Sequence, residues 1–441
     1  MRVFVIGAGL VGAMVVEALH AEHDLTVVDL DPAKLKRLAQ RYDVATVAAS
    51  AVSGRELAAA GIAHSELVIA CTSRDEANLV AGTFAQGAAP GAKTIVRTSS
   101  AEYAEIWREG RLDVDFVVSS ELETARAVSA AIGMPSARHT DSFAEGQVQV
   151  VEIDVRAEAS EDVVGRPLRR ARVPPESRVA AIIRDGRAVL PRGDAVPAPG
   201  DRLVVVASPA AAQAWCELVS PRRADVRDVV VYGAHELGVA IARALLDLAL
   251  VVRVIEPDVA RAALVAELLP RARVFNTPGL DREFLEREGI AGVQAAIFAM
   301  RDDARNLFAA SVARLHGAGF TIALAHDPGT AAVYDQAGID VTVDPQLVTA
   351  EEIVRFAHDP RTQQVSMLEG DRFVMLDVTA RPDSELVGLS LREMPIAGAL
   401  IGAIVRDGRP LFPRSDDVLR AGDRAIVFTE SSRAGIVERA L

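Results

Sequence analysis

Apolar and polar positions follow two different periods along the first 132 residues of the chain. Short apolar runs rich in β-branched side chains, typical of buried strands, alternate with longer stretches that repeat an apolar residue every three or four positions, as amphipathic helices do. The short runs predict six strands, at residues 2–6, 25–29, 44–47, 67–70, 93–97 and 116–118. The longer stretches predict helices between them, for example at residues 33–40, 75–86 and 121–132. This alternation indicates an α/β fold with a Rossmann-like, doubly wound parallel sheet.

We interpret residues 133–140 as a linker, because the pattern after them changes to strands joined by turns. The predicted strands lie at 147–155, 178–184, 187–190 and 202–207, with one turn at Asp185-Gly186. This is the pattern of a small β-rich module. Its sequence indicates no histidine beside an acid, no Ser-His pair and no lysine, so we expect neither hydride transfer nor nucleophilic catalysis from it.

The chain then repeats itself. The stretch 229–238 matches the opening stretch 3–12 at an offset of 226 residues, and three short motifs of the β-rich module recur at a common offset of 222. An offset shared by several motifs indicates an internal duplication. The predicted fold is therefore a tandem duplication of a Rossmann-like domain followed by a small β-rich α+β domain. We place the four domains at residues 1–135, 140–220, 225–358 and 362–441.

The opening strand runs into the motif Gly7-x-Gly9-x-x-Gly12. In a dinucleotide-binding loop the first glycine permits a tight turn, the second lets the backbone approach a pyrophosphate, and the third lets the next helix press on the sheet. Three glycines alone also fit an ordinary turn, but the second strand ends in Asp29, where such a fold places the acid that binds ribose hydroxyls. Asp29 could instead cap the next helix, yet Asp31-Pro32 already supplies that cap. The pattern therefore favours a nucleotide-binding domain.

Ligands of doubly wound sheets lie beyond the carboxyl ends of the strands, so the loops after the fourth and fifth strands should also face the nucleotide. Thr72 and Ser73 follow the fourth strand, and Arg97 ends the fifth, where a cation can meet a diphosphate or form a surface ion pair. The candidate cofactor-binding residues are Gly7, Ala8, Gly9, Leu10, Val11, Gly12, Asp29, Thr72, Ser73 and Arg97. We expect no catalytic residue, and the eight scattered histidines give no metal-ligand spacing.

The second copy of the loop differs at its centre. His235 stands in place of the middle glycine, and its side chain would occupy the space of a pyrophosphate, although an imidazolium could instead meet a phosphate. The strand at 321–325 ends without an arginine that matches Arg97, while Glu256 keeps the ribose acid. We therefore expect one tight nucleotide site per chain and an altered or degenerate second site.

Composition narrows the choice of partners. The 48 Lys and Arg stand against 61 Asp and Glu, and the net charge of −13 would repel a phosphate backbone, so nucleic acid is not an expected partner. No run approaches the 18 apolar residues of a membrane helix and the N-terminus lacks a signal-peptide pattern, so we expect a cytoplasmic protein. Cys71 and Cys216 are too few for a disulfide framework and are expected to be reduced, buried thiols.

Taken together, these features make the sequence resemble the TrkA family, the cytosolic regulatory subunits of bacterial Trk potassium uptake, built from two RCK (KTN) domains that are each followed by a TrkA-C domain. The resemblance covers essentially the whole chain. The stretches that carry it are 5–12, 26–31, 75–78, 96–97, 142–146, 164–168 and 179–186, with second-copy partners at 387–391 and 401–408. The chain departs from the family at Ala49-Ser50 and Thr277-Pro278, which replace a Gly-Asp pair that often touches adenine. This affects base selectivity more than binding.

The resemblance implies binding of NAD(H), or of ATP and ADP, with the three glycines and Arg97 at the phosphates and Asp29 at the adenosine ribose. It also implies that changes in occupancy pass to a membrane-embedded potassium transporter subunit, and that the chain associates with itself as a dimer or tetramer, peripheral on the inner face of the plasma membrane. Two alternatives stay open, an NAD-dependent oxidoreductase and an RCK-type nucleotide sensor for another cation transporter. The first lacks a substrate domain with an acid/base pair in this sequence.

Overall fold

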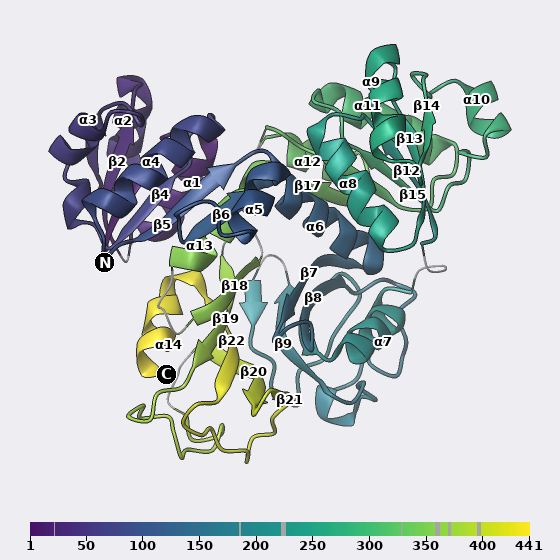
Figure 1. Cartoon of the computed structure of the whole chain (residues 1–441). Coiled ribbons are helices and arrows are strands. Elements are labelled where there is room, and N and C mark those ends of the chain that lie inside the picture. Colours follow the sequence, from purple (N-terminus) through teal and green to yellow (C-terminus); the bar gives the residue numbers. More distant parts are fainter. Residues whose placement is uncertain are drawn as a thin grey trace. The chain divides into compact units, whose positions relative to one another are not determined.

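The computed structural model describes the chain from Met1 to Leu441 except residues 22, 185–186, 222–225, 328, 358–361, 369–371 and 395–397. The chain divides into two compact units. The first combines Met1–Ile132 with Val226–Ala357, and the second combines Gly133–Asp225 with His358–Leu441 (Figure 1). Like domains from the two halves of the sequence therefore lie in the same unit.

The first unit contains two six-stranded parallel sheets. One has the order β3-β2-β1-β4-β5-β6, and the other has the equivalent order β14-β13-β12-β15-β16-β17. The strands of the first are β1 (Arg2–Ile6), β2 (Asp24–Asp29), β3 (Ala45–Ala48), β4 (Leu67–Ala70), β5 (Lys93–Thr98) and β6 (Phe116–Ser119). Those of the second are β12 (Asp228–Tyr232), β13 (Val251–Ile255), β14 (Arg273–Phe275), β15 (Ala295–Phe298), β16 (Thr321–Leu324) and β17 (Val341–Val343). The predicted doubly wound fold and its duplication are confirmed, and both sheets have a topological switch point beside β1 and β12.

Helices cover both faces of each parallel sheet. Around the first sheet they are α1 (Leu10–Leu19), α2 (Pro32–Arg41), α3 (Gly54–Ala59), α4 (Asp75–Ala88), α5 (Ala101–Arg108) and α6 (Ser120–Gly133). In the second copy they are α8 (Glu236–Asp247), α9 (Val259–Leu268), α10 (Arg282–Arg287), α11 (Asp303–Leu315), α12 (Thr330–Gln336) and α13 (Pro345–Ala357). The central strands β4 and β15 are buried at every residue, which explains their unbroken apolar runs. Asp31 caps α2 by accepting a hydrogen bond from the Ala33 amide, as its place before Pro32 predicts.

The last helix of each Rossmann-like domain packs on the other domain. In α6, Val128 and Ile132 belong to one buried apolar core with Ile241 of α8. In return, α13 packs against α1, β5 and β6, and its Phe356 ring stacks on Phe116 with ring centroids 4.0 Å apart. Because the two domains exchange these helices, neither sheet is fully covered by its own half of the sequence.

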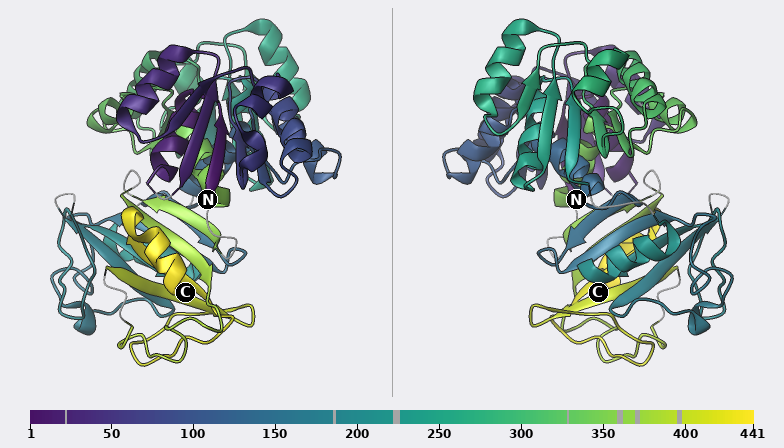
Figure 2. Two further views of the ribbon diagram at one scale, coloured as in Figure 1. Left: turned by 90° about the vertical axis from the view of Figure 1, so that its left-hand side faces the viewer. Right: turned by 90° about the vertical axis from the view of Figure 1, so that its right-hand side faces the viewer.

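The second unit contains two five-stranded antiparallel sheets, in the orders β10-β9-β11-β8-β7 and β18-β19-β22-β20-β21. The first is formed by β7 (Ala137–Phe143), β8 (Val148–Asp154), β9 (Ser177–Arg184), β10 (Arg187–Val189) and β11 (Arg202–Ala207), followed by α7 (Pro209–Val219). The second is formed by β18 (Thr362–Leu368), β19 (Phe373–Thr379), β20 (Ala399–Arg406), β21 (Arg409–Leu411) and β22 (Arg424–Glu430), followed by α14 (Ala434–Ala440). One buried core joins both sheets, with Phe143 and Val150 from the first and Met375 and Phe428 from the second. Figure 2 shows α14 (yellow) across one sheet and α7 (teal) across the other.

Strand β7 begins inside the segment that the sequence analysis interprets as a linker, so that interpretation is wrong from Ala137 onward. The strand was hidden because only Ala137 and Phe143 are buried along it, and its other five side chains are polar. Backbone pairing with β8, where Thr140 stands opposite Val151, holds it in the sheet. The predicted turn at Asp185-Gly186 lies outside the described residues.

The expectation of no histidine beside an acid is also wrong. His139 Nε2 lies 3.0 Å from the Asp141 carboxylate and 3.3 Å from the Ser366 hydroxyl of β18. Because β7 is a strand, the side chains of His139 and Asp141 point to the same face of the sheet. Ser366 belongs to the other β-rich domain, so no local sequence pattern could indicate its contact with His139. Both contacts use the same ring nitrogen. A Ser-His-Asp relay uses the two nitrogens separately, and this arrangement therefore lacks its geometry.

Candidate functional site

The three glycines of the opening loop have different surroundings. Gly7 has a φ of +117°, and a Cβ there would lie 2.8 Å from the Thr72 amide nitrogen. A Cβ on Gly12 would lie 1.9 Å from the carbonyl oxygen of Gly7. A Cβ on Gly9 would meet no atom within 4 Å. Gly7 and Gly12 are therefore required by the fold, whereas the space beside Gly9 is open, which is what a loop that lets a ligand approach its backbone needs.

A pocket of about 380 Å³ lies at this loop. Four of the predicted residues line it, namely Gly9, Asp29, Thr72 and Ser73. The other lining residues are Ile6, Val28, Leu30, Asp31, Lys34, Ala49, Ser50, Ala51, Val52, Arg74 and Ala77. The pocket thus combines apolar walls with a few convergent polar groups, the usual character of a small-molecule site.

The Asp29 carboxylate is held in place by backbone amides. Its Oδ2 accepts a hydrogen bond of 2.7 Å from the Ala8 N–H, and its Oδ1 accepts one of 2.8 Å from the Asp31 N–H. A carboxylate has about four acceptor positions, so two bonds leave capacity for the paired hydroxyls of a ribose. Ala8 therefore acts through its backbone, by fixing the carboxylate.

The loop after β4 is organised by Asn78, a buried residue of α4 that the candidate site did not include. Its amide group donates to the Thr72 carbonyl at 3.0 Å and to the Arg97 carbonyl at 2.9 Å, and its Oδ1 accepts from the Thr72 N–H at 2.8 Å. The Arg97 guanidinium donates to the same Thr72 carbonyl at 2.9 Å and to the Ser120 hydroxyl at 3.2 Å. Arg97 is not among the residues that line the pocket, and it supports the loop instead. Its predicted contact with phosphate stays a prediction.

The remaining predicted residues belong to the start of α1. Leu10 is exposed and Val11 is buried in the core, so neither side chain lines the pocket. Cys71, at the end of β4, is also buried, and its Sγ lies 3.8 Å from the Gly7 carbonyl oxygen. Burial raises the pKa of this thiol to about 12, so it is neutral at physiological pH.

Two cations that line the pocket, Lys34 and Arg74, were absent from the candidate residues. Lys34 lies in the first turn of α2, where a lysine ordinarily indicates only a solvated surface. A signal was nevertheless present in the duplication, because Arg261 occupies the corresponding position of α9 in the second copy.

The second copy keeps the backbone plan of the first. A Cβ on Gly238 would lie 2.0 Å from the Gly233 carbonyl oxygen, as at Gly12. Glu256 Oε2 accepts from the Ala234 N–H and its Oε1 from the Asp258 N–H, both at 2.9 Å. The acid therefore has the same two supports as Asp29.

At the middle of this loop, the second copy has the side chains of His235 and Arg261 in contact with each other. Arg261 Nη1 lies 3.2 Å from His235 Nε2, and because a guanidinium can only donate, the ring nitrogen accepts. The other ring nitrogen, Nδ1, is buried without a hydrogen-bond partner. The imidazole thus occupies the side-chain position that is open space beside Gly9 in the first copy.

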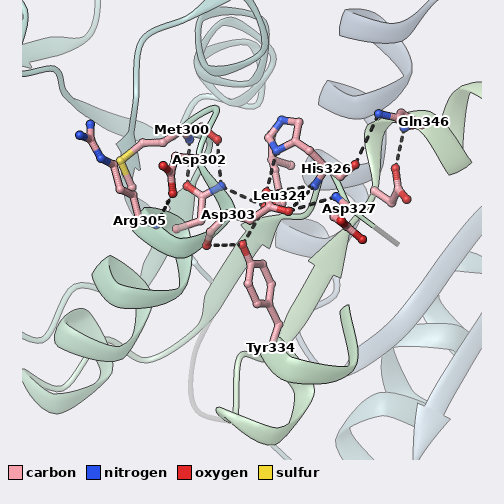
Figure 3. Close-up of polar contacts among 11 residues, drawn as sticks. Met300, Asp302, Asp303, Arg305, Leu324, His326, Asp327, Tyr334 and Gln346 are labelled. Atoms are coloured by element: carbon pink, nitrogen blue, oxygen red, sulfur yellow. Dashed lines mark hydrogen bonds and ion pairs between the residues drawn. The ribbon is translucent and has the colours of Figure 1, made fainter. Parts of the chain in front are cut away.

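The carboxyl ends of β15 and β16 are also closed by internal contacts (Figure 3). The Asp303 carboxylate accepts from the His326 ring at 2.8 Å and from the backbone N–H groups of His326 and Asp327 at 3.0 Å. Burial by itself raises the pKa of Asp303, but these hydrogen bonds outweigh it and lower the pKa overall. Asn306 donates to the Leu324 carbonyl as Asn78 does to that of Arg97, so an apolar side chain takes the place of the arginine.

Comparison with known proteins assigns both domain types. The TrkA-N domain family matches residues 3–120 and 229–345, and the TrkA-C domain family matches 150–220 and 375–441. The Trk system potassium uptake protein TrkA homolog 1 of Methanosarcina mazei is 28% identical, over 100% of this chain and 99% of its own. The TrkA homolog of Archaeoglobus fulgidus is 29% identical, over 98% and 97%. TrkA of Azorhizobium caulinodans is 29% identical, over 97% and 96%.

Solved structures agree on the fold. The GsuK RCK domain covers 100% of this chain and 94% of its own with a TM-score of 0.60 at 17% identity. The GsuK channel bound to NAD covers 100% of this chain and 78% of its own with a TM-score of 0.61 at 18% identity. Within the described residues, no helix is both long and apolar enough to cross a membrane.

Proposed function

This chain belongs to the TrkA family, and we propose that it is a nucleotide-binding regulatory subunit of a Trk-type potassium uptake system. In this proposal it binds NAD(H), or ATP or ADP, in the pocket of the first Rossmann-like domain. It performs no catalysis. Bound nucleotide changes the arrangement of its domains, and a membrane-embedded potassium transporter subunit responds to that change. The protein is cytoplasmic and peripheral on the inner face of the plasma membrane through this partner.

One observation carries the binding part of the proposal. The open space beside Gly9 adjoins a carboxylate, Asp29, whose two oxygens are fixed by backbone amides. Such a pair offers backbone N–H groups at a helix N-terminus to a diphosphate and an acid to the adjoining ribose. The NAD bound in the GsuK channel, which shares this fold, supports the choice of ligand.

The regulatory part needs a physical connection from the pocket to the second domain. Arg97 links the Thr72 carbonyl, at the pocket, to the Ser120 hydroxyl at the start of α6. The Thr349 hydroxyl of α13 lies 3.0 Å from that of Ser120. Ser120 and Thr349 are both buried, so the contact between their hydroxyls is shielded from water. Together with the hydrogen bonds of Arg97, this contact joins the nucleotide loop to the two exchanged helices.

A ligand shifts such an arrangement only by the difference in its affinity for the two states. We propose that the domains of a dimer or tetramer of this chain supply those states. A buried polar connection suits this purpose, since a displaced group must either find a new partner or stay unsatisfied, at a cost of roughly 1–3 kcal/mol.

Calorimetry with NADH, NADPH, ATP and ADP tests the binding proposal. The wild-type chain should bind NADH or an adenine nucleotide, and Gly9→Trp, whose side chain would fill the open space, should abolish binding. Failure of all four ligands would refute it. Incubation with NAD and a panel of alcohols and hydroxy acids tests the absence of catalysis, and steady NADH production above the Gly9→Trp control would instead establish the oxidoreductase.

The transporter is tested by potassium uptake in cells that carry either the wild-type chain or Gly9→Trp at equal abundance. Uptake should differ between them if occupancy regulates the partner. Equal potassium uptake together with altered transport of another cation would favour the sensor of a different transporter.

A further inference from the structure

Lys34 stands apart from the other cations of its helix. It lines the nucleotide pocket together with Gly9 and Asp29 and is half-buried, whereas Lys36 and Arg37 are exposed. Within the described part of the chain, the Lys34 ammonium group has no hydrogen bond or ion pair. A cation held at the wall of a pocket without a partner is available to an anionic ligand.

The second copy shows where a cation at this position can reach. Arg261 and Lys34 are each the third residue of the helix that follows the ribose acid. The Arg261 guanidinium lies 3.2 Å from His235 Nε2, and His235 is the counterpart of Gly9. An arginine at this place in α9 therefore reaches the side chain of the middle residue of the loop.

We propose that the Lys34 ammonium group binds a phosphate of the nucleotide that lies beside Gly9. This inference rests on the proposed function and adds to it a residue that determines which ligands bind. In the second copy, the His235 ring stands at the position proposed for the phosphate, and Arg261 donates a hydrogen bond to it. The first copy leaves both the space and the cation free. The site therefore requires a charged phosphate and discriminates against uncharged adenosine.

The test compares Lys34→Gln with Lys36→Gln, which removes the same charge from an exposed position of the same helix. Dissociation constants are measured by calorimetry for adenosine, ADP, NADH and NADPH. Lys34→Gln should weaken ADP and NADH about tenfold, equivalent to about 1.4 kcal/mol, and leave adenosine unchanged. Lys36→Gln should bind all four like the wild type, and Lys34→Arg should retain ADP and NADH because it keeps the charge.

Salt dependence gives a second measurement, since the loss of an ion pair with phosphate should reduce the salt sensitivity of NADH binding in Lys34→Gln. A thermal melt shows that the variant is folded. If Lys34→Gln kept the wild-type affinity for ADP and NADH, this inference would be overturned while the proposed function would stand. A loss confined to NADPH would also overturn it, because the lysine would then bind the phosphate on the ribose. If the wild-type chain bound neither ADP nor NADH, the proposed function would fall and this inference with it.

Discussion

At the scale of single residues, the fold requires Gly7 and Gly12 of the first loop, whereas Gly9 leaves space for a ligand. A Cβ on Gly12 would lie 1.9 Å from the Gly7 carbonyl oxygen, whereas one on Gly9 would meet open space. We predict that Gly12→Ala lowers the free energy of unfolding by about 1–3 kcal/mol, as overpacking does, and that Gly9→Ala changes it by no more than about 0.5 kcal/mol. Urea unfolding measures both.

Gly238→Ala is a matched control for Gly12→Ala, because its Cβ would lie 2.0 Å from the Gly233 carbonyl oxygen. It should destabilise the protein to a similar extent. An equal loss of stability in Gly9→Ala and Gly12→Ala would contradict the assignment of the Gly9 space to a ligand.

The Asp29 carboxylate should select nucleotides with a free ribose 2′-hydroxyl, because an acid there accepts hydroxyl protons and repels a 2′-phosphate. We predict that NADH binds at least about tenfold more tightly than NADPH, and that Asp29→Asn weakens NADH, since the amide replaces one acceptor by a donor. Glu256→Gln alters the same support in the second copy and should leave NADH binding intact. Equal affinity for NADPH and NADH would remove Asp29 from the ribose position.

The sequence was sufficient to place the glycines in the loop and Asp29 at the pocket, because these positions depend on the backbone course of a strand-loop-helix, which spacing alone encodes. The sequence was insufficient to place Lys34 at the pocket or to show that Asn78 organises the loop after β4. A cation in a first helical turn looks like any surface charge, and an asparagine in a helix reveals nothing about which carbonyls it meets. Arg97 lies near the end of β5, as expected, but its guanidinium is hydrogen-bonded to Thr72 and Ser120 of the same domain, and no local pattern contains contacts between residues so far apart in the sequence.

At the scale of elements, the second loop with α8 and α9 keeps the glycines of the turn, the acid and the helix cation of the first copy, but not its open space. Gly233, Gly238, Glu256 and the cation Arg261 remain, while the His235 side chain occupies the space that is open beside Gly9. We predict that His235→Gly creates a second, weaker nucleotide site, so that calorimetry with NADH changes from one bound ligand per chain to two. It should be weaker because Leu324 replaces the arginine that supports the first loop.

His235→Ala provides the control for this change, since a Cβ keeps part of the obstruction and restricts the approach of the backbone. It should give less second-site binding than glycine. Two tight sites already present in the wild-type chain would show that the histidine accommodates a phosphate rather than replacing it.

The strands of the parallel sheets could be predicted because strands buried on both faces are apolar throughout. Strand β7 could not, because five of its seven residues are polar and its place depends on pairing with β8. The exchange of α6 and α13 was equally inaccessible. Each helix has an ordinary amphipathic pattern, which shows that one face is buried but not against which sheet.

At the scale of the whole molecule, the hydroxyl contact between Ser120 and Thr349 is a direct polar connection between the two Rossmann-like domains. We predict that Thr349→Val leaves NADH affinity within about twofold, because the pocket is untouched, but abolishes the change in amide hydrogen exchange that NADH produces in α13. Loss of the hydroxyl, which contacts both Ser120 and the Pro345 carbonyl, should cost on the order of 1 kcal/mol of stability.

Thr124→Val is the matched control for Thr349→Val. Both threonines are buried and both donate to the carbonyl of the residue four positions earlier, but this hydrogen bond of Thr124 stays within α6. The control should lose similar stability and retain the response of α13. A response that survives in Thr349→Val would show that occupancy is transmitted by another route.

The exchange of helices also has a consequence for how the protein is made. Helix α1 ends at Leu19, but α13, which packs on it, begins at Pro345, roughly 330 residues later. At about 5–20 residues per second, a ribosome needs on the order of 15–65 seconds to synthesise that interval. During this time the face of α1 that α13 covers is bare on every nascent chain. Neighbouring ribosomes on one message then hold several such faces close together, and a completed chain that supplies its α13 to a neighbour would produce an interlocked dimer.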